Sequence, residues 1–223
     1  MIRILDLFCG LGGVARGFQR YLIEHEIEFE YHAVDNDPRI LRAHKFLNPH
    51  SKTFYRDAWS FTDEELREYD FIWASPPCET HSTLMCYYNK NSEKWKPPDM
   101  RLWDLITRLY KLEVPFIIEN VRPYYGFIIK PTAQANRHCL WSNLALKSIE
   151  LDHPKFEDIK DSTKRLLMYH AVPRAIVKVL RGRKLRDALR DMMHWKLAYK
   201  IAEQVIPMLL GEKKMVVQGR LDL

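Results

Sequence analysis

The sequence predicts an α/β fold, with a mostly parallel sheet and helices on both faces. Within the first 120 residues, short apolar runs alternate with segments of helical periodicity. A glycine-rich turn follows the first run. Candidate ligand-binding or reactive residues follow several of the later runs. Strand–helix alternation of this kind is typical of parallel sheets. Ligands of such folds bind beyond the carboxyl ends of the strands.

Each expected strand is a short apolar run that ends in a turn or at a polar residue. The run at 53–55 is the weakest, and the run at 115–118 begins at Pro115. In chain order, the expected strands are residues 3–8, 31–34, 53–55, 70–74, 115–118 and 139–143.

The expected helices lie between these strands and at the end of the chain. The first covers about 14–27, after the glycines, and the second begins at Pro38, because proline is favoured in the first turn of a helix. A third covers 100–112. A final helix at 195–210 has apolar residues at four-residue spacing.

Composition excludes several classes of protein. The 223 residues are 47% hydrophobic and 29% charged, which is typical of an ordinary globular protein. No apolar run approaches the roughly 20 residues that cross a bilayer. The N-terminal apolar run leads into glycines without a cleavage site, which indicates a strand and not a signal peptide. The four cysteines form no CxxC pair, so we expect free thiols and no metal site. From the apolar runs and the N-terminus we expect no membrane association and a cytoplasmic location.

The net charge of +6 is concentrated in one segment. Residues 174–190 hold seven Lys and Arg against a single acid, Asp187, and the remaining charges balance. A local positive block on a neutral body favours a polyanionic partner, most simply nucleic acid, although a solvated helical face is equally compatible. Its basic residues are Arg174, Lys178, Arg181, Arg183, Lys184, Arg186 and Arg190.

A glycine-rich loop follows the first strand. Gly10, Gly12 and Ala15 match G-x-G-x-x-A, and Asp35 lies about 20 residues further on. This pattern is typical of dinucleotide binding. S-adenosylmethionine also carries a ribose, and it likewise needs a close approach to the backbone and an acid for the ribose hydroxyls. The loop alone therefore does not distinguish NAD from S-adenosylmethionine.

A stiff turn follows the strand at 70–74. Pro76 and Pro77 fix their own φ angles and force the preceding residues to be extended, which presents Cys78 at the edge of the sheet. A cysteine so placed is a candidate nucleophile, with its thiolate stabilised by a nearby cation such as His81 or Arg137.

Glu119 ends the apolar strand at 115–118. Burial disfavours the charged form of a carboxyl group, so we expect a raised pKa for Glu119. A carboxyl group that is protonated near neutral pH can donate a hydrogen bond to a ring nitrogen.

Together these segments resemble the C5-cytosine DNA methyltransferase family, in order along almost the whole chain. DLFCGLGGVARGF at 6–18 resembles the cofactor loop of the family and AVDND at 33–37 its ribose motif. SPPC at 75–78 resembles the nucleophile motif, and ENV at 119–121 the glutamate motif. NRHCLWSN at 136–143 and MMHWKLAYKIAE at 192–203 resemble the two later motifs.

The resemblance implies a Rossmann-like fold and a methyl transfer from S-adenosylmethionine to C5 of a flipped-out cytosine in double-stranded DNA. It implies catalytic roles for Cys78, Glu119 and Arg137. The implied cofactor-binding residues are Phe8, Gly10, Leu11, Gly12, Gly13, Asp35, Asn36, Asp57, Ala58, Pro77 and Asp191. The expected substrate-binding residues are Ser75, Pro76, Asn120, His138, Arg174, Lys178, Arg181 and Arg183.

The chain departs from the family pattern in three places. Glu79-Thr-His follows the nucleophile where the family often has Gln-x-Phe-Ser. Only Arg137 is present where the family has two arginines two residues apart, with His138 or Cys139 near the second place. Arg190-Asp191 stands where the family commonly has Gly-Asn.

The expected organisation is a catalytic and cofactor-binding core at 1–143, a small basic target-recognition region at 144–190 and a C-terminal helix at 191–223 that returns to the core. The short middle region predicts a short recognition sequence and leaves room for a second subunit. The loop 82–98, with Lys90, is either a second DNA contact or a surface loop.

Three alternative functions remain. One is methylation of RNA, since relatives with this core act on transfer RNA, although the chain lacks their Cys-Phe-Thr tripeptide. Another is a non-catalytic nucleic-acid-binding protein that retains the fold. An NAD-dependent reductase comes last, because its mechanism has no use for Pro-Pro-Cys.

Overall fold

The expected sheet is present and contains seven strands in the order β3-β2-β1-β4-β5-β7-β6. β1 to β5 run parallel to one another, whereas β7 is antiparallel to β5 and β6 is antiparallel to β7. The prediction of a mostly parallel sheet is therefore confirmed. The strands are β1 (Ile2–Leu7), β2 (Phe29–Asp35), β3 (Ser51–Tyr55), β4 (Phe71–Ala74), β5 (Phe116–Asn120), β6 (Ala133–Ala135) and β7 (His138–Ser142).

The computed structural model describes residues 1–88, 92–152, 158–159 and 162–211. Lys90 and the last twelve residues of the expected C-terminal region, 212–223, lie outside the described residues. Its helices are α1 (Gly13–Glu24), α2 (Pro38–Leu47), α3 (Asp63–Leu66), α4 (Arg101–Leu112), α5 (Thr163–Tyr169), α6 (Gly182–Asp191) and α7 (Trp195–Leu209), with 3₁₀ helices η1 (Ala58–Ser60), η2 (Thr83–Tyr87) and η4 (Arg174–Lys178).

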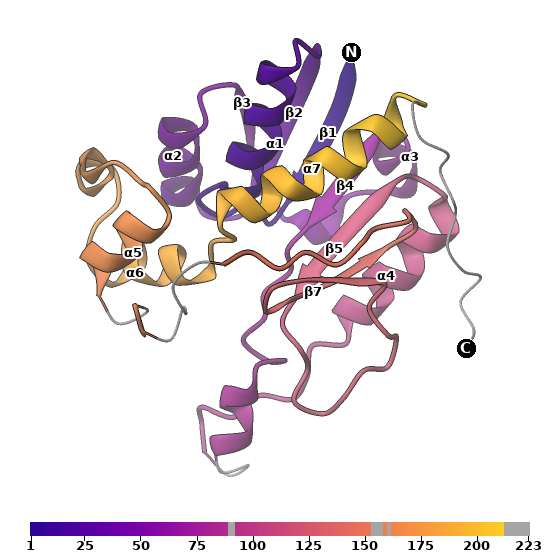
Figure 1. Ribbon diagram of the computed structural model, residues 1–223. Helices are drawn as coiled ribbons and strands as arrows, with labels where there is room; N and C mark the ends of the chain where they lie inside the picture. The colour runs from indigo at the N-terminus through magenta and orange to yellow at the C-terminus, as the bar shows by residue number, and fades with distance from the viewer. Residues whose placement is uncertain (89–91, 153–157, 160–161, 212–223) are drawn as a thin grey trace.

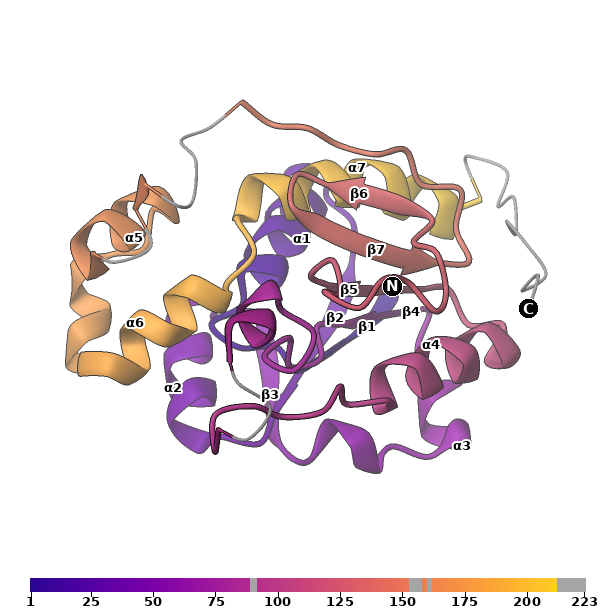
Figure 2. The same ribbon diagram turned by 90° about the horizontal axis from the view of Figure 1, so that it is seen from below.

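Helices cover both faces of the sheet (Figure 2). α1 and α7 lie on one face, where they bury β-strand residues such as Ile4 and Tyr31. α3 and α4 lie on the other, against Leu5 and Leu7. Successive side chains of a strand point to opposite faces, so β1 supplies both hydrophobic cores from alternate positions.

A third hydrophobic cluster joins the basic segment to the core of the fold. Ile40 and Ala43 of α2 are buried with Leu166 of α5, and with Leu185 and Leu189 of α6. Figure 1 shows α5 and α6 beside α2, at the end of the sheet where β1 leads into α1. The basic segment forms η4 and α6, and the break at Gly182 is the start of α6, where Gly182 has φ +61°.

The order of the strands creates a switch point between β1 and β4. The chain proceeds outward from β1 to β2 and β3, and then returns to place β4 on the other side of β1. The glycine loop after β1 and the Pro-Pro-Cys turn after β4 therefore leave the sheet side by side. Open α/β sheets bind their ligands at this point.

Candidate active site

The Pro-Pro-Cys turn is held in place from both sides. The carbonyl oxygen of Cys78 accepts hydrogen bonds from the backbone N–H groups of His81 and Ser82, each at 3.0 Å. From β5, the side-chain amide of Asn120 donates a hydrogen bond of 2.9 Å to the carbonyl oxygen of Pro76. The rigid turn that the prolines predict is thus anchored to the neighbouring strand.

Three separated segments bring charged groups to Cys78. Burial raises the pKa of the Cys78 thiol to about 12, and the negative charges of Asp191 and Glu119 act in the same direction. The guanidinium of Arg137 opposes this rise. The structure therefore brings together all three predicted catalytic residues. It corrects the expectation of a stabilised thiolate, because Cys78 is a thiol at neutral pH in the free protein.

Glu119 is paired with a histidine. Its side chain is 12% exposed and lies 2.6 Å from Nδ1 of His138. Burial alone would raise the pKa of Glu119, but His138, a hydrogen bond from Ser75 and the charge of Arg137 together lower it. The expectation of a raised pKa is wrong for this carboxyl group, because the sequence did not reveal its partner across the antiparallel β5–β7 pair.

The side chain of His81 contacts an aromatic cluster. Its Nδ1 lies 2.8 Å from the hydroxyl of Tyr125, which also accepts a hydrogen bond of 3.0 Å from Trp103 Nε1. His81 is buried, and burial lowers its pKa. Of the two cations suggested for Cys78, Arg137 is the one whose charge acts on the thiol.

The glycine loop is tied to the acid that ends β2. The N–H of Gly10 donates to Oδ2 of Asp35 at 3.2 Å, and the N–H of Asp37 donates to Oδ1 at 2.9 Å. Burial raises the pKa of Asp35. Gly10 has φ +51°, and a Cβ there would meet nothing within 4 Å, so its outer side is open to a ligand.

The later glycines are packed against other elements. Gly12 has φ +80°, and a Cβ there would overlap the side chains of Asn48 and His44. A Cβ at Gly13 would overlap the carbonyl oxygen of Met193, just before α7. Both glycines and Leu11 are buried, so this part of the loop is fixed by its neighbours.

His44 and Asn48 support the loop and were not singled out from the sequence. Nδ1 of His44 lies 3.1 Å from the carbonyl oxygen of Gly10, and Asn48 donates to that of Leu11 at 3.1 Å. Burial lowers the pKa of His44 to about 4, so the ring is neutral. Their position on one side of α2, at 44 and 48, is the signal that could have indicated a shared role.

The remaining predicted cofactor residues lie around this loop. Phe8 packs against Trp59 with ring centroids 4.8 Å apart, and Asp57 caps η1 by accepting from the N–H of Trp59. Ala58 is buried, whereas Asn36, Pro77 and Asp191 are exposed. An open glycine, an acid at the end of β2 and an aromatic pair fit the sugar and base of a nucleoside cofactor.

The predicted DNA-contacting cations lie on η4 and α6. Lys178, Arg181 and Arg183 line a cavity of about 580 Å³ together with Arg186, and Arg174 is exposed on η4. Lys184 forms an ion pair of 3.0 Å with Asp37, two residues after Asp35. The basic segment is therefore attached to the core near the end of β2.

Fold and site define a Rossmann-like methyltransferase. The family model for C-5 cytosine-specific DNA methylases matches residues 2–125, more than half of the chain, and the protein belongs to this family. The matched region contains both Cys78 and Glu119. Comparison with curated protein sequences gives no match.

Solved structures support the fold. The chain is similar to a Spodoptera frugiperda DNMT2 mutant, with 13% identity, a TM-score of 0.54 and coverage of 94% of this chain and 100% of the other. Schizosaccharomyces pombe Dnmt2 methyltransferase is also similar, with 11% identity and a TM-score of 0.55. That match covers 93% of this chain and 99% of the other. A DNA modification methyltransferase encoded within an E. coli prophage gives 23% identity and a TM-score of 0.37. That match covers 54% of this chain but only 32% of the E. coli protein.

Two absences concern the described stretches of the chain. None of their helices has the length and apolar content that crossing a bilayer requires. No group of three or more His, Cys, Asp or Glu side chains in those stretches could hold a metal ion.

Proposed function

We propose that the protein methylates C5 of cytosine in double-stranded DNA, with S-adenosylmethionine as the methyl donor and Cys78 as the nucleophile. The observation that carries this proposal is the convergence of a thiol, a carboxylate and a guanidinium at one edge of the sheet. Cys78 follows β4, Glu119 belongs to β5, and Arg137 immediately precedes β7. Each has a separate task in the reaction.

Cytosine C5 is too weak a nucleophile to accept a methyl group unless the ring is first activated. Cys78 Sγ attacks C6, forming a carbon–sulfur bond, while the thiol proton passes to water. Glu119 delivers a proton to N3, which takes up the electron pair displaced from the ring. C5 then has the electron density of an enamine carbon.

The remaining steps restore the enzyme. S-adenosylmethionine, when bound, supplies the methyl group that C5 accepts. The C5 proton then leaves to water, the carbon–sulfur bond breaks, and Cys78 departs with the electron pair and regains a proton. N3 returns its proton to Glu119. The net change is one methyl group gained and one proton released.

The charge state of the free site fits this sequence of steps. With a pKa of about 12, Cys78 is only weakly reactive until the negative charges around the thiol are compensated. The charge of Arg137 acts on Cys78, and Arg137 would hold O2 or the backbone of the target nucleotide. A stacked base is out of reach, so the cytosine must leave the helix, at a cost of a few kcal/mol.

The methyl donor would occupy the switch point beside this site. Asp35 would hold the ribose hydroxyls, Phe8 and Trp59 would lie against the adenine, and Gly10 would let the ligand approach the backbone. The exposed carboxylate of Asp57 would accept a hydrogen bond from the adenine amino group. These groups surround the end of β1 and reach the neighbouring turn that carries Cys78.

The cations of η4 and α6 would contact the DNA backbone. Lys178, Arg181 and Arg183 share one cavity and lie on the same side of the protein as the cofactor loop. Replacing any of them by alanine should lower the slope of log affinity against log salt by about one. Lys200→Ala, on α7 and paired with Glu203, serves as the control that leaves the slope unchanged.

Trapping on 5-fluorocytosine tests the chemistry. Fluorine at C5 cannot leave as a proton does, so methylation should stop at a covalent adduct that survives a denaturing gel. We expect an adduct with fluorinated duplex DNA and S-adenosylmethionine, its loss in Cys78→Ser, and its retention in Cys139→Ser, which changes a buried thiol on β7. An adduct with fluorinated RNA alone would move the substrate to RNA. No adduct with either, although S-adenosylmethionine binds, would refute the proposal.

A further inference from the structure

Glu119 and His138 make a short side-chain contact between β5 and β7. Nδ1 of His138 lies 2.6 Å from Oε1 of Glu119, and the two side chains are 10% and 12% exposed. Glu119 lies opposite Leu140 in the β5–β7 pair, so His138 reaches it diagonally from two residues away. A short, sheltered contact between a ring nitrogen and a carboxylate is a strong hydrogen bond.

This contact bears on a step that Glu119 alone cannot perform. An ionised carboxylate only accepts hydrogen bonds, whereas N3 of cytosine is itself an acceptor and needs a proton. The pKa of Glu119 is lowered, so the group is ionised near neutral pH. A proton for N3 must therefore reach Glu119 from a neighbour.

The neighbours of Glu119 differ in whether they can release a proton. Arginine keeps its proton at any physiological pH, and a serine hydroxyl does not ionise, which excludes Arg137 and Ser75. Imidazole is the side chain that changes charge between about pH 5 and 8. The charged and titratable groups that face the pair from the surrounding elements are Cys78 after β4, Arg137 and Cys139 on the β7 side, His170 after α5 and Asp191 at the end of α6.

We propose that His138 is a positioning residue that orients Glu119 and holds the proton that Glu119 passes to N3. This inference rests on the proposed function. As the bond from Cys78 to C6 forms, the proton on Nδ1 moves to Oε1 of Glu119, and Glu119 gives a proton to N3. When the bond breaks, N3 returns the proton to Glu119 and the imidazole takes it back. The family's second arginine, absent here, could not release a proton in this way.

The first test measures Glu119 without any turnover. The titration of the Glu119 carboxyl carbon is followed by 13C NMR on the full chain, with Glu119→Gln to assign its signal. In His138→Gln we expect the pKa of Glu119 to rise, because burial is no longer opposed by the ring. In His138→Arg, which retains a cation, the pKa should stay low. An unchanged pKa in His138→Gln would overturn the inference.

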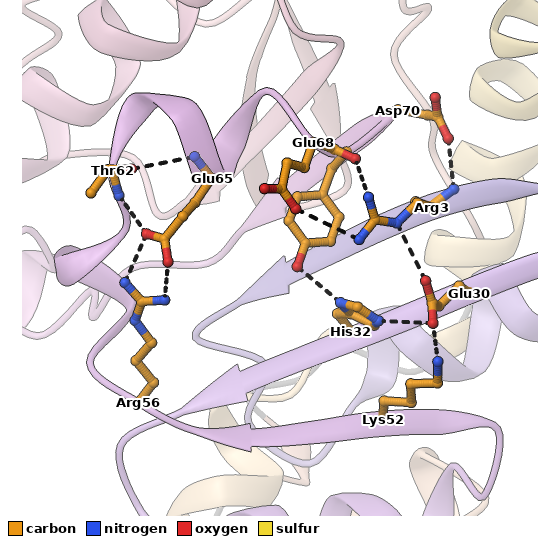
Figure 3. Close-up of polar contacts among 10 residues, drawn as sticks. Arg3, Glu30, His32, Lys52, Arg56, Thr62, Glu65, Glu68 and Asp70 are labelled. Atoms are coloured by element: carbon orange, nitrogen blue, oxygen red, sulfur yellow. Dashed lines mark hydrogen bonds and ion pairs between the residues drawn. The ribbon is translucent and has the colours of Figure 1, made fainter.

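His32→Gln is the matched control. Nε2 of His32 lies 3.3 Å from Oε1 of Glu30, and the His32 side chain is also 10% exposed. This second histidine–glutamate contact belongs to a network with Arg3 and Lys52 (Figure 3). Arg3 lies near the start of β1, whereas Cys78 follows the end of β4, which runs parallel to β1. Its replacement should leave the titration of Glu119 unchanged.

The second test measures the rate of adduct formation on 5-fluorocytosine DNA against pH. His138→Arg can pair with Glu119 but has no proton to give. The native protein should therefore be at least tenfold faster near pH 6, and this advantage should shrink as the pH rises. His32→Gln should match the native protein at every pH, and thermal unfolding should confirm that all variants are folded.

The outcomes separate the two proposals. A native-to-His138→Arg rate ratio that is constant with pH, or equal to one, would overturn the role of His138 while leaving the nucleophile intact. No adduct with the native protein at any pH would reject the proposed function, and the role of His138 with it.

Discussion

The side chain of Asn120 joins the two halves of the catalytic site, because its amide donates a hydrogen bond of 2.9 Å to the carbonyl oxygen of Pro76. The same side chain accepts from the N–H of Val121 at 2.9 Å. Asn120 is 1% exposed and directly follows Glu119. A buried amide therefore ties the turn that carries the nucleophile to the strand that carries the carboxylate.

Replacing Asn120 by alanine should slow adduct formation by more than the loss of folding stability explains. Leaving the Pro76 carbonyl without its partner should cost about 1–3 kcal/mol of unfolding free energy. Asn143→Ala is a matched control, because Asn143 donates to Val114 at 2.9 Å and accepts from the N–H of Phe116 at the other end of β5. Denaturant unfolding should give similar losses for both variants. Equal adduct rates would contradict a positioning role for Asn120.

The reactivity of Cys78 toward a small alkylating agent should depend on the charges around it. Asp191 raises the pKa of the thiol and Arg137 lowers it. Asp191→Asn should therefore speed alkylation at pH 8, and Arg137→Gln should slow it, because the thiolate is the reactive form. Mass spectrometry of the Cys78 peptide measures the rate, with Cys9 and Cys139 in the same sample as buried references. Identical rates in both variants would show that these charges do not reach the thiol.

Asp6 predicts a pH dependence of stability. It is 1% exposed in β1, accepts a hydrogen bond of 2.9 Å from the hydroxyl of Tyr31, and burial raises its pKa to about 8. Between the unfolded value of 3.8 and this folded value, the folded state binds more protons than the unfolded state. Stability should therefore fall as the pH rises through this window and change no further above it.

Asp6→Asn tests that dependence, because asparagine cannot ionise. Unfolding in urea from pH 4 to 9 should show a smaller loss of stability in the variant than in the native protein. The difference should grow up to about pH 8 and then level off. Parallel curves would mean that Asp6 stays ionised in the folded protein.

Two substitutions in the glycine loop should have different effects. Gly12→Ala meets both a left-handed backbone and the side chains of His44 and Asn48, so it should strongly destabilise the fold. Gly10→Ala should cost only about 1–2 kcal/mol of backbone strain, because no protein atom lies within 4 Å of the added carbon. That carbon nevertheless fills the open side of the loop.

Calorimetric titration with S-adenosylmethionine distinguishes the two positions. Gly10→Ala should bind the cofactor weakly while remaining folded at room temperature, as judged by circular dichroism. Full affinity in this variant would place the cofactor elsewhere.

The sequence was informative where a strand ends in a distinctive turn. Asp35, Cys78 and Glu119 were expected at one edge of a parallel sheet, and the structure brings their strand ends there. The short helices α3 and α5 were not expected, and α6 was foreseen only in the alternative interpretation of the basic segment, a solvated helical face. Its buried residues Leu185 and Leu189 follow helical periodicity, but they stand among many charged residues that favoured a nucleic-acid contact equally.

The charge states of the site could not be predicted in the same way. The expected pKa of Glu119 was reversed because His138 approaches from an antiparallel strand whose register the sequence does not encode locally. The thiolate expected at Cys78 was likewise replaced by a thiol, because the folded chain buries the side chain and because Asp191 approaches from a helix more than 100 residues away. Both differences depend on long-range contacts.

The hydrophobic cluster that α2 shares with α5 and α6 limits how specificity can change in this protein. Because Ile40 and Ala43 are buried with Leu166 and Leu189, the basic region is not an independent module. Removing it would uncover Ile40 and Ala43 of α2, the helix that also carries His44, the support of the glycine loop. If the basic region reads DNA as proposed, new target sequences are therefore more accessible through point changes on the outer side of α6 than through transplantation of whole segments.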